Sequence, residues 1–564
     1  MAQTLTGYDM VLALSESTIN KQFKKLHQEN IIYKQWKLLA GNVFKRSARK
    51  PPFFITGADV NFDSRLNIWM GLQQDFVKTG DFSMLASLTD SQNNFDFGWN
   101  TVMKAPVIQI EDRNTQEVVL NLAFQSGYLY HLGDPMQEVS VYDLKGCVYS
   151  FRAPIGKLKI NKQAMLLQAQ NEMNAVIRDS GLKDKDFRIE SLFLNFSNAK
   201  VNQFDVTRSK FPKEVEVPLT AAMNNYFNLF LPASDNPYIL GYGVSRTKVG
   251  SREKAMFEPT AVGFSTSFSS RQSGSRIPGQ FSAVNFLMMA NDNKAPTHQT
   301  AGVLAHSLIE TGKAQQTPVS GIFALEHSLF TQYLSSLDQY VESIFSSQSG
   351  ININGGFKSG TMRATQRDYH KKHDTIDTTY TLSREPIKNL AGAGGIEVRY
   401  KLHVSVRVGI HIGKDWEIKS ATLSTSGAYT KGDINKKGSV GWLSFQLKGG
   451  KEGRFDLANK LTKPNIAFDE NPNMFEGPVG KVIGSIVTLI FAWPMAIVNG
   501  IIGQIVADLG VNTAVKNNPL IDSLNQLDLL NKTNSVILPL GKTYTYKNLR
   551  YLADKKIVVY DIAY

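Results

Sequence analysis

The fold is decided by one alternating stretch, Ile396-Glu-Val-Arg-Tyr-Lys-Leu-His-Val-Ser-Val-Arg-Val-Gly-Ile-His-Ile412. Apolar side chains occupy every even position, and glycine or polar, mostly cationic, side chains fill the odd ones. Successive side chains of a strand point to opposite faces, so the pattern predicts one unbroken strand with a dry face and a wet face. At about 3.3 Å per residue the strand would extend over roughly 56 Å, whereas a usual strand has about 5–6 residues.

A strand of this length indicates an elongated protein. A compact core does not need it, so the strand either lines a long apolar groove or tube, or belongs to a sheet wrapped along a long helix. Both arrangements favour a protein that binds an apolar ligand.

The composition is that of an ordinary folded protein, with 564 residues, 42% of them apolar and 20% charged. A net charge of +13 favours anionic partners such as a lipid surface, nucleic acid or an acidic protein, although dispersed Lys and Arg also serve plain solubility. Cys147 is the only cysteine, which excludes an intramolecular disulfide and a cysteine metal cluster. The N-terminus shows no Sec signal peptide, so we expect cytosolic synthesis and, if the protein is released, a non-classical route.

Local patterns predict mostly strands outside a few helices. A short apolar strand at 10–14 leads into a helix that begins at Ser15 or Ser17 and has Ile19, Phe23 and Leu26 on one face. We expect a second helix at 161–180, a Ser-rich surface loop at 263–279 and a Gly-rich break at 350–360. Further strands are predicted at 117–130, 138–151, 187–196, 214–219, 375–382, 416–423, 441–448 and within 542–564.

Two long apolar segments accompany the alternating stretch. Residues 321–346 repeat apolar side chains at helical spacing, Phe330 and Tyr333 among them, which predicts a helix of roughly 39 Å. Residues 482–507 carry no charge and are long enough to cross a bilayer, but Pro494 lies in their middle and small residues recur every four positions. We favour a buried, kinked helix here and keep membrane insertion, permanent or triggered, as the alternative.

Motifs for catalysis are absent from the sequence. There is no P-loop, no Gly-x-Ser-x-Gly and no His-Glu-x-x-His. His370 and His373 are two histidines in a polar loop, too few for zinc, and His403 and His411 lie on the wet face of the long strand. Cys147 is interpreted as a small core residue. We therefore expect no enzyme, no metal and no cofactor apart from a possible bound lipid.

The apolar segments together predict an extended lipid-binding interior. Burying a chain of about 16 carbons would contribute on the order of 12 kcal/mol, and each Lys or Arg near an anionic membrane about 1 kcal/mol. The candidate lipid-groove residues come from the long strand, the 321–346 helix and the 482–507 segment: Val404, Val406, Val408, Ile410, Phe330, Tyr333, Ile490, Trp493 and Ile497.

Short segments scattered along the chain resemble a known family. They are Gly7-Tyr-Asp-Met-Val11, Ser17-Thr-Ile-Asn-Lys-Gln-Phe23, Val284-Asn-Phe-Leu-Met-Met289, Gly321-Ile-Phe-Ala-Leu-Glu-His-Ser-Leu-Phe330 and Gly541-Lys-Thr-Tyr-Thr-Tyr-Lys-Asn548. In these the sequence resembles the OrfX-type proteins and their forty-seven-kilodalton companion, encoded beside neurotoxin genes in clostridia and in insecticidal loci of other bacteria. The apolar 482–507 segment and the Gly-rich 427–453 region depart from that family.

The resemblance implies an elongated α+β fold similar to tubular lipid-binding (TULIP) proteins, with long curved antiparallel sheets wrapped around long helices. It also implies a non-enzymatic accessory protein of a toxin system that binds lipid or phosphoinositide and an anionic membrane, with a toxin or sister TULIP-like protein as a further partner and no nucleic acid. The alternatives are a membrane-inserting or pore-forming component and a protein-only scaffold. We place a helix-and-sheet module at 1–350 and a β-rich module, with a long helix at 479–510, at 351–564.

Two substitutions test whether these faces are buried. Val404→Asp and Ile497→Lys each place a charge in the expected apolar interior, at a cost of several kcal/mol. Both variants should therefore be recovered in the insoluble fraction, as measured by sedimentation of expressed protein. Normal solubility of both would show that neither face is buried.

Overall fold

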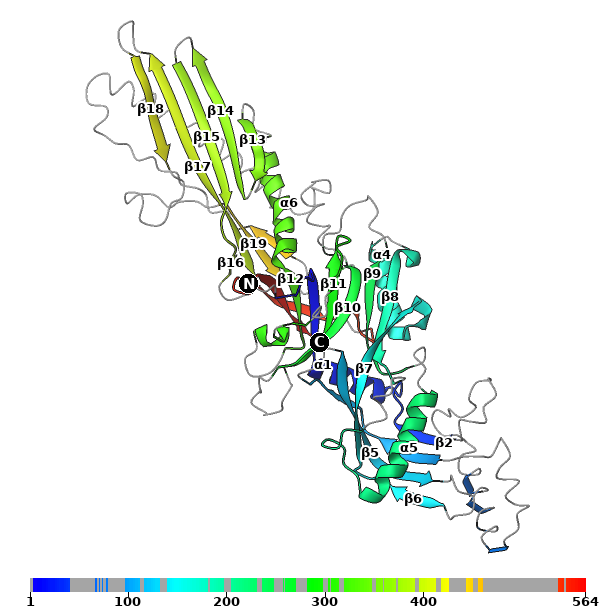
Figure 1. Cartoon of the computed structure of the whole chain (residues 1–564). Coiled ribbons are helices and arrows are strands. Elements are labelled where there is room, and N and C mark those ends of the chain that lie inside the picture. The colour runs from blue at the N-terminus through cyan, green and yellow to red at the C-terminus, as the bar shows by residue number, and fades with distance from the viewer. Residues whose placement is uncertain are drawn as a thin grey trace.

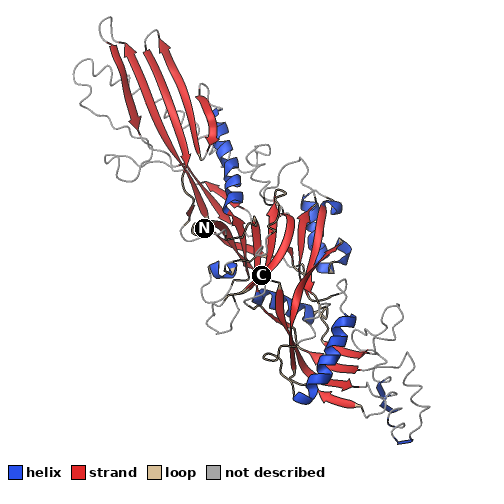
Figure 2. Cartoon of the chain, in the orientation of Figure 1, coloured by secondary structure: helices blue, strands red, loops and turns tan. Residues whose placement is uncertain are grey.

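The molecule is elongated and consists mostly of antiparallel sheets with a few helices, which confirms the α+β class (Figures 1 and 2). Every strand pairing in the described part of the chain is antiparallel. The computed structural model describes residues 4–40, 97–111, 116–131, 139–180, 183–196, 204–230, 236–247, 259–269, 281–297, 306–313, 319–346, 351–358, 360–371, 374–390, 395–411, 417–425, 443–449, 455–459, 536–541 and 544–564, with a few isolated residues between them.

A sheet of six strands lies in the middle of the molecule (Figure 1). It brings the first strand of the chain and the last two together, since β1 pairs with β12 and β12 with β23. Its strands, in spatial order, are β10 (Pro259–Ser267), β11 (Ala283–Ala290), β1 (Met10–Ser15), β12 (Gly321–Glu326), β23 (Ile557–Ala563) and β22 (Thr545–Leu552). The tail thus forms strands as predicted, while the division of the chain at residue 350 stays a prediction.

A second sheet of nine strands turns from the centre toward one end of the molecule. Two long strands make the turn: β5 pairs first with β7 and then with β3, and β7 pairs first with β5 and then with β8. The path is β2 (Gln35–Ala40), β3 (Phe97–Met103), β5 (Glu117–His131), β7 (Val148–Ile160), β8 (Phe187–Leu194), β9 (Ile239–Arg246) and β21 (Val536–Ile537), with β4 (Val107–Gln109) and β6 (Ser140–Asp143) pairing beside β5.

The third sheet has eight strands and forms the opposite end, and the alternating stretch is its longest strand (Figure 1). β17 (Ile396–His411) has 16 residues without a break, as predicted. β15 pairs along one edge of β17, and β19 and then β18 pair along the other. The remaining bounds are β13 (Ile351–Lys358), β14 (Thr361–Lys371), β15 (Asp374–Arg384), β16 (Lys388–Asn389), β18 (Glu417–Thr425), β19 (Leu443–Gly449) and β20 (Phe455–Asn459).

In the part of the chain that the structure describes, four longer helices lie against these sheets: α1 (Glu16–Gln28), α4 (Leu167–Ser180), α5 (Lys213–Phe230) and α6 (His327–Ser346). Three short 3₁₀ turns, η2 (Lys162–Ala164), η3 (Asp184–Asp186) and η5 (Leu308–Thr311), complete the described elements. The helix predicted at 161–180 is thus η2 followed by α4. Phe151 of β7 and Phe196, two residues after β8, meet Phe227 of α5, each with its ring centroid 4.7 Å from that of Phe227.

One cluster of buried apolar side chains touches all three sheets, and we call it the lengthwise core. It includes Trp99 of the nine-strand sheet, Phe323 of the six-strand sheet, and Tyr380 and Ile396 of the eight-strand sheet. Each of these side chains is at most 1% exposed. This cluster therefore follows the long axis through all three sheets, and two smaller clusters lie beside it.

The helix predicted at 321–346 is wrong in its first part. Residues 321–326 form β12, which is enclosed on both sides by β1 and β23, and the helix starts only at His327. A continuous apolar run fits a fully buried strand as well as a helix, so spacing alone could not separate the two.

Four other predictions also need correction. The strand predicted at 214–219 is the start of α5, whose buried side chains Val215, Leu219 and Met223 recur at helical spacing. The loop predicted at 263–279 is strand β10 as far as Ser267, because buried Asn285 donates to Ser265 Oγ at 3.2 Å and satisfies the serine across the strands. The strand predicted at 138–151 is interrupted between β6 and β7, and the break predicted at 350–360 is strand β13.

Helix α1 satisfies the open edge of the short strand β4. Ser15 caps the helix, as predicted, by accepting a hydrogen bond from Thr18 N–H at 3.3 Å. Asn20 donates to Ile108 O at 3.0 Å and accepts from Ile108 N–H at 2.8 Å. One turn earlier, Glu16 Oε2 accepts from Ile110 N–H at 2.8 Å.

Glu16 is a carboxyl group in the interior, only 7% exposed. Burial raises the pKa of Glu16 from 4.5 to about 7, although the hydrogen bond from Ile110 acts in the opposite direction. The position in the first turn of a helix also favours the charged form, by about 0.3–1 kcal/mol, which is less than the effect of burial. The folded protein therefore binds a proton here that the unfolded chain releases near pH 4.5.

Replacing Glu16 should change how stability depends on pH. The contribution of a carboxyl with a raised pKa is fully present below about pH 4.5 and is lost as pH rises through about 7, an effect of roughly 3 kcal/mol. Glu16→Gln keeps a neutral acceptor for Ile110 and has no carboxyl group to titrate. As the pH rises between these values, the unfolding free energy of the wild type should therefore fall relative to that of the variant. Urea denaturation at pH 4.5 and pH 8 measures this, with Glu214→Gln on the surface of α5 as the control. Parallel pH profiles for Glu16→Gln and the wild type would contradict the raised pKa.

Candidate functional site

The candidate site is the face of the eight-strand sheet on which α6 lies. Burial alternates along β14, where Met362, Ala364 and Gln366 are buried and Thr361 and Arg363 are exposed. Tyr380 and Leu382 of β15 and Ile396 and Val398 of β17 complete this dry face. Side chains of α6 belong to the same core: Leu329, Phe330 and Leu334. The face is thus a continuation of the lengthwise core.

The register of the strands extends this arrangement toward the far end of the sheet. Val404 of β17 is the register partner of Tyr380, Val406 of Thr378 and Val408 of Ile376. On the other edge of β17, Val406 pairs with Leu423, Val408 with Ala421 and Ile410 with Ile418. β14, β15, β17 and β18 continue beyond the end of α6 (Figure 1). Apart from Thr378, the partners of these residues are apolar, so the row of apolar sequence positions continues along β17.

Polar contacts fix α6 on the sheet. Arg384 at the end of β15 donates to Asp338 Oδ2 of α6 at 2.5 Å, and the two side chains are 18% and 6% exposed. One turn later, Glu342 Oε2 accepts from Phe357 N–H of β13 at 3.2 Å. Within the dry face, the Tyr380 hydroxyl donates to Gln366 Oε1 at 3.0 Å. The polar side chains of Asp338, Glu342 and Gln366 thus each have a hydrogen-bond partner, as is usual for buried polar groups.

The structure brings most of the sequence-predicted groove residues to this sheet. Phe330 is fully buried on the inner face of α6, and Tyr333 lies on the same helix. The four predicted residues of the long strand, Val404, Val406, Val408 and Ile410, are on β17 as expected. Ile490, Trp493 and Ile497 lie outside the described residues. That these residues line a lipid groove stays a prediction.

Sequence reasoning missed the residues that join helix and sheet. Asp338 and Arg384 are 46 positions apart, and no local pattern links an acidic residue in a helix to an arginine at the end of a strand. Gln366 and Tyr380 are equally unmarked in the sequence, although they are partners across a hairpin. Only the register of β14 and β15 would have revealed this second pair.

Cys147 is held in a structural role. Cys147 is 4% exposed and packs in the lengthwise core, in the turn before β7. Burial and then the negative charge of Asp143 raise the pKa of the Cys147 thiol, which is opposite to what a nucleophile needs. Among the described residues, no three His, Cys, Asp or Glu side chains gather as they would around a metal ion. His370 lies at the end of β14 instead of in a loop.

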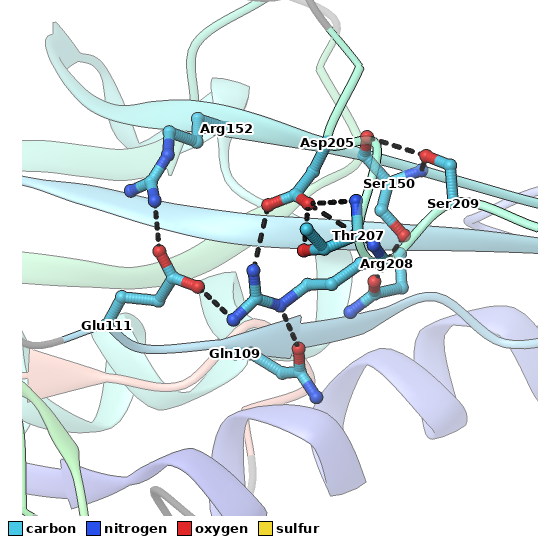
Figure 3. A network of polar contacts seen from close by, with 9 residues as sticks. Gln109, Glu111, Ser150, Arg152, Asp205, Thr207, Arg208 and Ser209 are labelled. Atoms are coloured by element: carbon cyan, nitrogen blue, oxygen red, sulfur yellow. Dashed lines mark hydrogen bonds and ion pairs between the residues drawn. The ribbon is translucent and has the colours of Figure 1, made fainter.

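The polar network in Figure 3 fastens the segment 204–210 to the edge of β7. Glu111 forms ion pairs with Arg152 and Arg208, and Arg208 also donates to Asp205 Oδ2 at 2.8 Å. Although burial alone would raise it, hydrogen bonds from Thr207 and Arg208 lower the pKa of Asp205. Two carboxylates balance two guanidinium groups. We therefore interpret the network as structural, holding the segment 204–210 against β7.

The structure also bears on membrane spans. No helix in the described ranges is both long enough and apolar enough to cross a bilayer. The predicted candidate at 482–507 lies outside those ranges.

Comparisons with known proteins give likenesses in structure only. No family model matches the sequence, and no curated protein does. Among solved structures, the chain is similar to P47 of Clostridium botulinum E1, with 11% identity, 99% of each chain covered and a TM-score of 0.43. It is also similar to P47 from Clostridium botulinum A2, with 11% identity, 100% of this chain and 98% of that chain covered, and a TM-score of 0.42. These are the same kind of protein that the short sequence segments indicated.

The contact between Asp338 and Arg384 gives a test of how α6 is held. Arg384→Leu leaves a buried carboxylate without its cation, which typically costs about 3–5 kcal/mol. The double variant Asp338→Leu/Arg384→Leu removes both charges and should be clearly more stable than the single variant. Urea denaturation of the three proteins measures the difference. Equal loss in the single and double variants would show that the pair does not hold the helix.

Proposed function

We propose that this chain is a non-enzymatic lipid-binding protein that serves a bacterial toxin or insecticidal system. In this proposal acyl chains lie along the dry face of the eight-strand sheet, beyond the end of α6. The observation that carries the proposal is the unbroken β17, whose even positions stay apolar over all 16 residues of the strand.

The physical argument is that such a row of apolar positions needs apolar cover in water. α6 supplies this cover near the middle of the molecule, where Met362, Tyr380 and Leu382 are at most 1% exposed. Past α6, acyl chains parallel to the strand would supply it, at about 0.8 kcal/mol for each CH₂ removed from water. This interaction requires no specific polar side chain.

The other face of the sheet would favour an anionic membrane. The odd positions of β17 include Arg399, Lys401 and Arg407, and Arg363 of β14 is exposed. The whole chain carries a net charge of +13. Each Lys or Arg near an anionic surface contributes about 1 kcal/mol to docking, and phosphoinositides would be favoured for the same reason.

The association with a toxin system is supported by the sequence segments that resemble the OrfX-type and forty-seven-kilodalton proteins. The same resemblance supports a TULIP-like mode of lipid binding and a toxin or sister TULIP-like protein as partner. The alternatives are a membrane-inserting component and a protein-only scaffold. The following experiment separates both of them from a lipid-binding protein.

A labelled-cysteine experiment tests the proposed lipid face. Cys147 is buried, so a cysteine introduced elsewhere can be labelled selectively with a polarity-sensitive dye. The dye on Val406→Cys should shift to shorter wavelength when vesicles with anionic phospholipid are added. The dye on Ser405→Cys, on the face proposed to meet the polar head groups, should shift much less. Lipid should also be found by mass spectrometry in organic extracts of the purified protein.

Three results would count against the proposal. Extracts that contain only background lipid, together with no dye shift at either position, would favour a protein scaffold. Release of a dye enclosed in the vesicles would favour a pore-forming component. Equal shifts at positions 405 and 406 would show that β17 has no lipid-specific face.

A further inference from the structure

A cavity of about 260 Å³ lies away from the eight-strand sheet, where α4 approaches the adjoining ends of β7 and β8. Its walls include five apolar side chains. Met173 and Ile177 are one turn apart on α4, Ile160 ends β7, and Phe187 and Ile189 begin β8. Ile160 and Ile189 are register partners, so the sheet side of the wall is continuous.

Polar residues from η2 and η3 also line this cavity, and because most of them are exposed, we take them as its mouth. Lys162 of η2 and Asp184 of η3 form an ion pair across it, with Nζ and Oδ2 2.8 Å apart. Lys185, the next residue, is exposed and lines the same mouth. Two lysines against one aspartate leave one positive charge in excess, and Lys185 supplies it because Lys162 is already paired.

The cavity is separate from the lengthwise core. Met173, Phe187 and Ile189 belong to a different buried cluster, together with Met165 and Tyr242. Tyr242 fixes the start of α4 in this cluster, since its hydroxyl accepts from Leu166 N–H at 3.1 Å. A ligand here would therefore occupy a different place from lipid on β17.

We propose that this cavity binds a single-chain amphiphile with an anionic head, of the class of a medium-chain fatty acid. A cavity of about 150 Å³ holds benzene, so this one has room for roughly ten non-hydrogen atoms. Apolar walls receive the chain and a cationic mouth receives the carboxylate, which is the usual arrangement of a small-ligand pocket. Lys185 is the residue that selects an anionic head, and Met173 and Ile177 contact the chain.

Titration calorimetry of the full-length protein with octanoate, decanoate and dodecanoate, below their micelle concentrations, tests the proposal. Affinity should increase about fourfold for each added CH₂ and level off near ten carbons, where the cavity is full. Decanol, which has the same chain without the charge, should bind more weakly than decanoate. Affinity independent of chain length, or no heat with any of the acids, would overturn the proposal.

Two variants separate the chain contact from the head contact. Ile177→Trp places a larger side chain in the cavity and should weaken decanoate binding at least tenfold. Lys185→Gln should weaken decanoate about two- to fivefold, as expected for an exposed ion pair, and leave decanol unchanged. Lys183→Gln, an exposed lysine outside the cavity wall, is the matched control and should bind both ligands normally. If Ile177→Trp does not fold, the Lys185→Gln variant is the test. Unchanged decanoate binding by Lys185→Gln would overturn the assignment of Lys185 to the carboxylate head.

The outcome is distinguishable from that of the proposed function. The Ile177→Trp variant should still yield lipid in organic extracts, and with Val406→Cys it should still show the dye shift. Both observations report on lipid at β17 and not on the cavity. Vesicles of phospholipid alone should not displace decanoate from the wild type. Displacement by vesicles would identify the occupant as a bilayer acyl chain and would overturn the assignment to a free acid.

Discussion

The structure depends on one constraint, the two-sided character of a long strand. Side chains on a strand alternate in direction, so sixteen residues without an interruption commit a whole face to one environment. Neighbouring strands must then match it position by position, as β15 does from Tyr400 to Gly409 of β17. Where α6 lies on this face, its side chains merge with the sheet into one core. The elongated shape follows because the apolar rows run along the strands.

The six-strand sheet joins the two ends of the molecule. β1 and β23 bring the start and the end of the chain beside β12, and α1 and α6 leave this sheet in different directions (Figure 1). Asn389 strengthens the junction with the eight-strand sheet, because it donates to Tyr551 O at 2.8 Å and accepts from Tyr551 N–H at 2.7 Å.

Long periodic segments could be predicted from the sequence, and short buried ones could not. β17, β5 and the Ser15 cap of α1 follow from alternation or capping chemistry within a few residues. The sequence predicts a helix for β12 because both faces of this strand are buried, which removes the alternation. It predicts a loop from Gly263 because the partner of Ser265, Asn285, lies across the sheet. The α4 cavity has no sequence signal of its own, since its walls come from three elements that meet only in the fold.

Hydrogen exchange along β17, followed by mass spectrometry on overlapping peptides, tests the central claim most directly. A single strand bonded on both edges should exchange slowly from Ile396 through His411, with protection that continues past the level of α6. Slow exchange limited to 396–404 and fast exchange from 405 onward would contradict the account. It would mean that the dry face ends with the helix and that no long apolar surface exists for a lipid to follow.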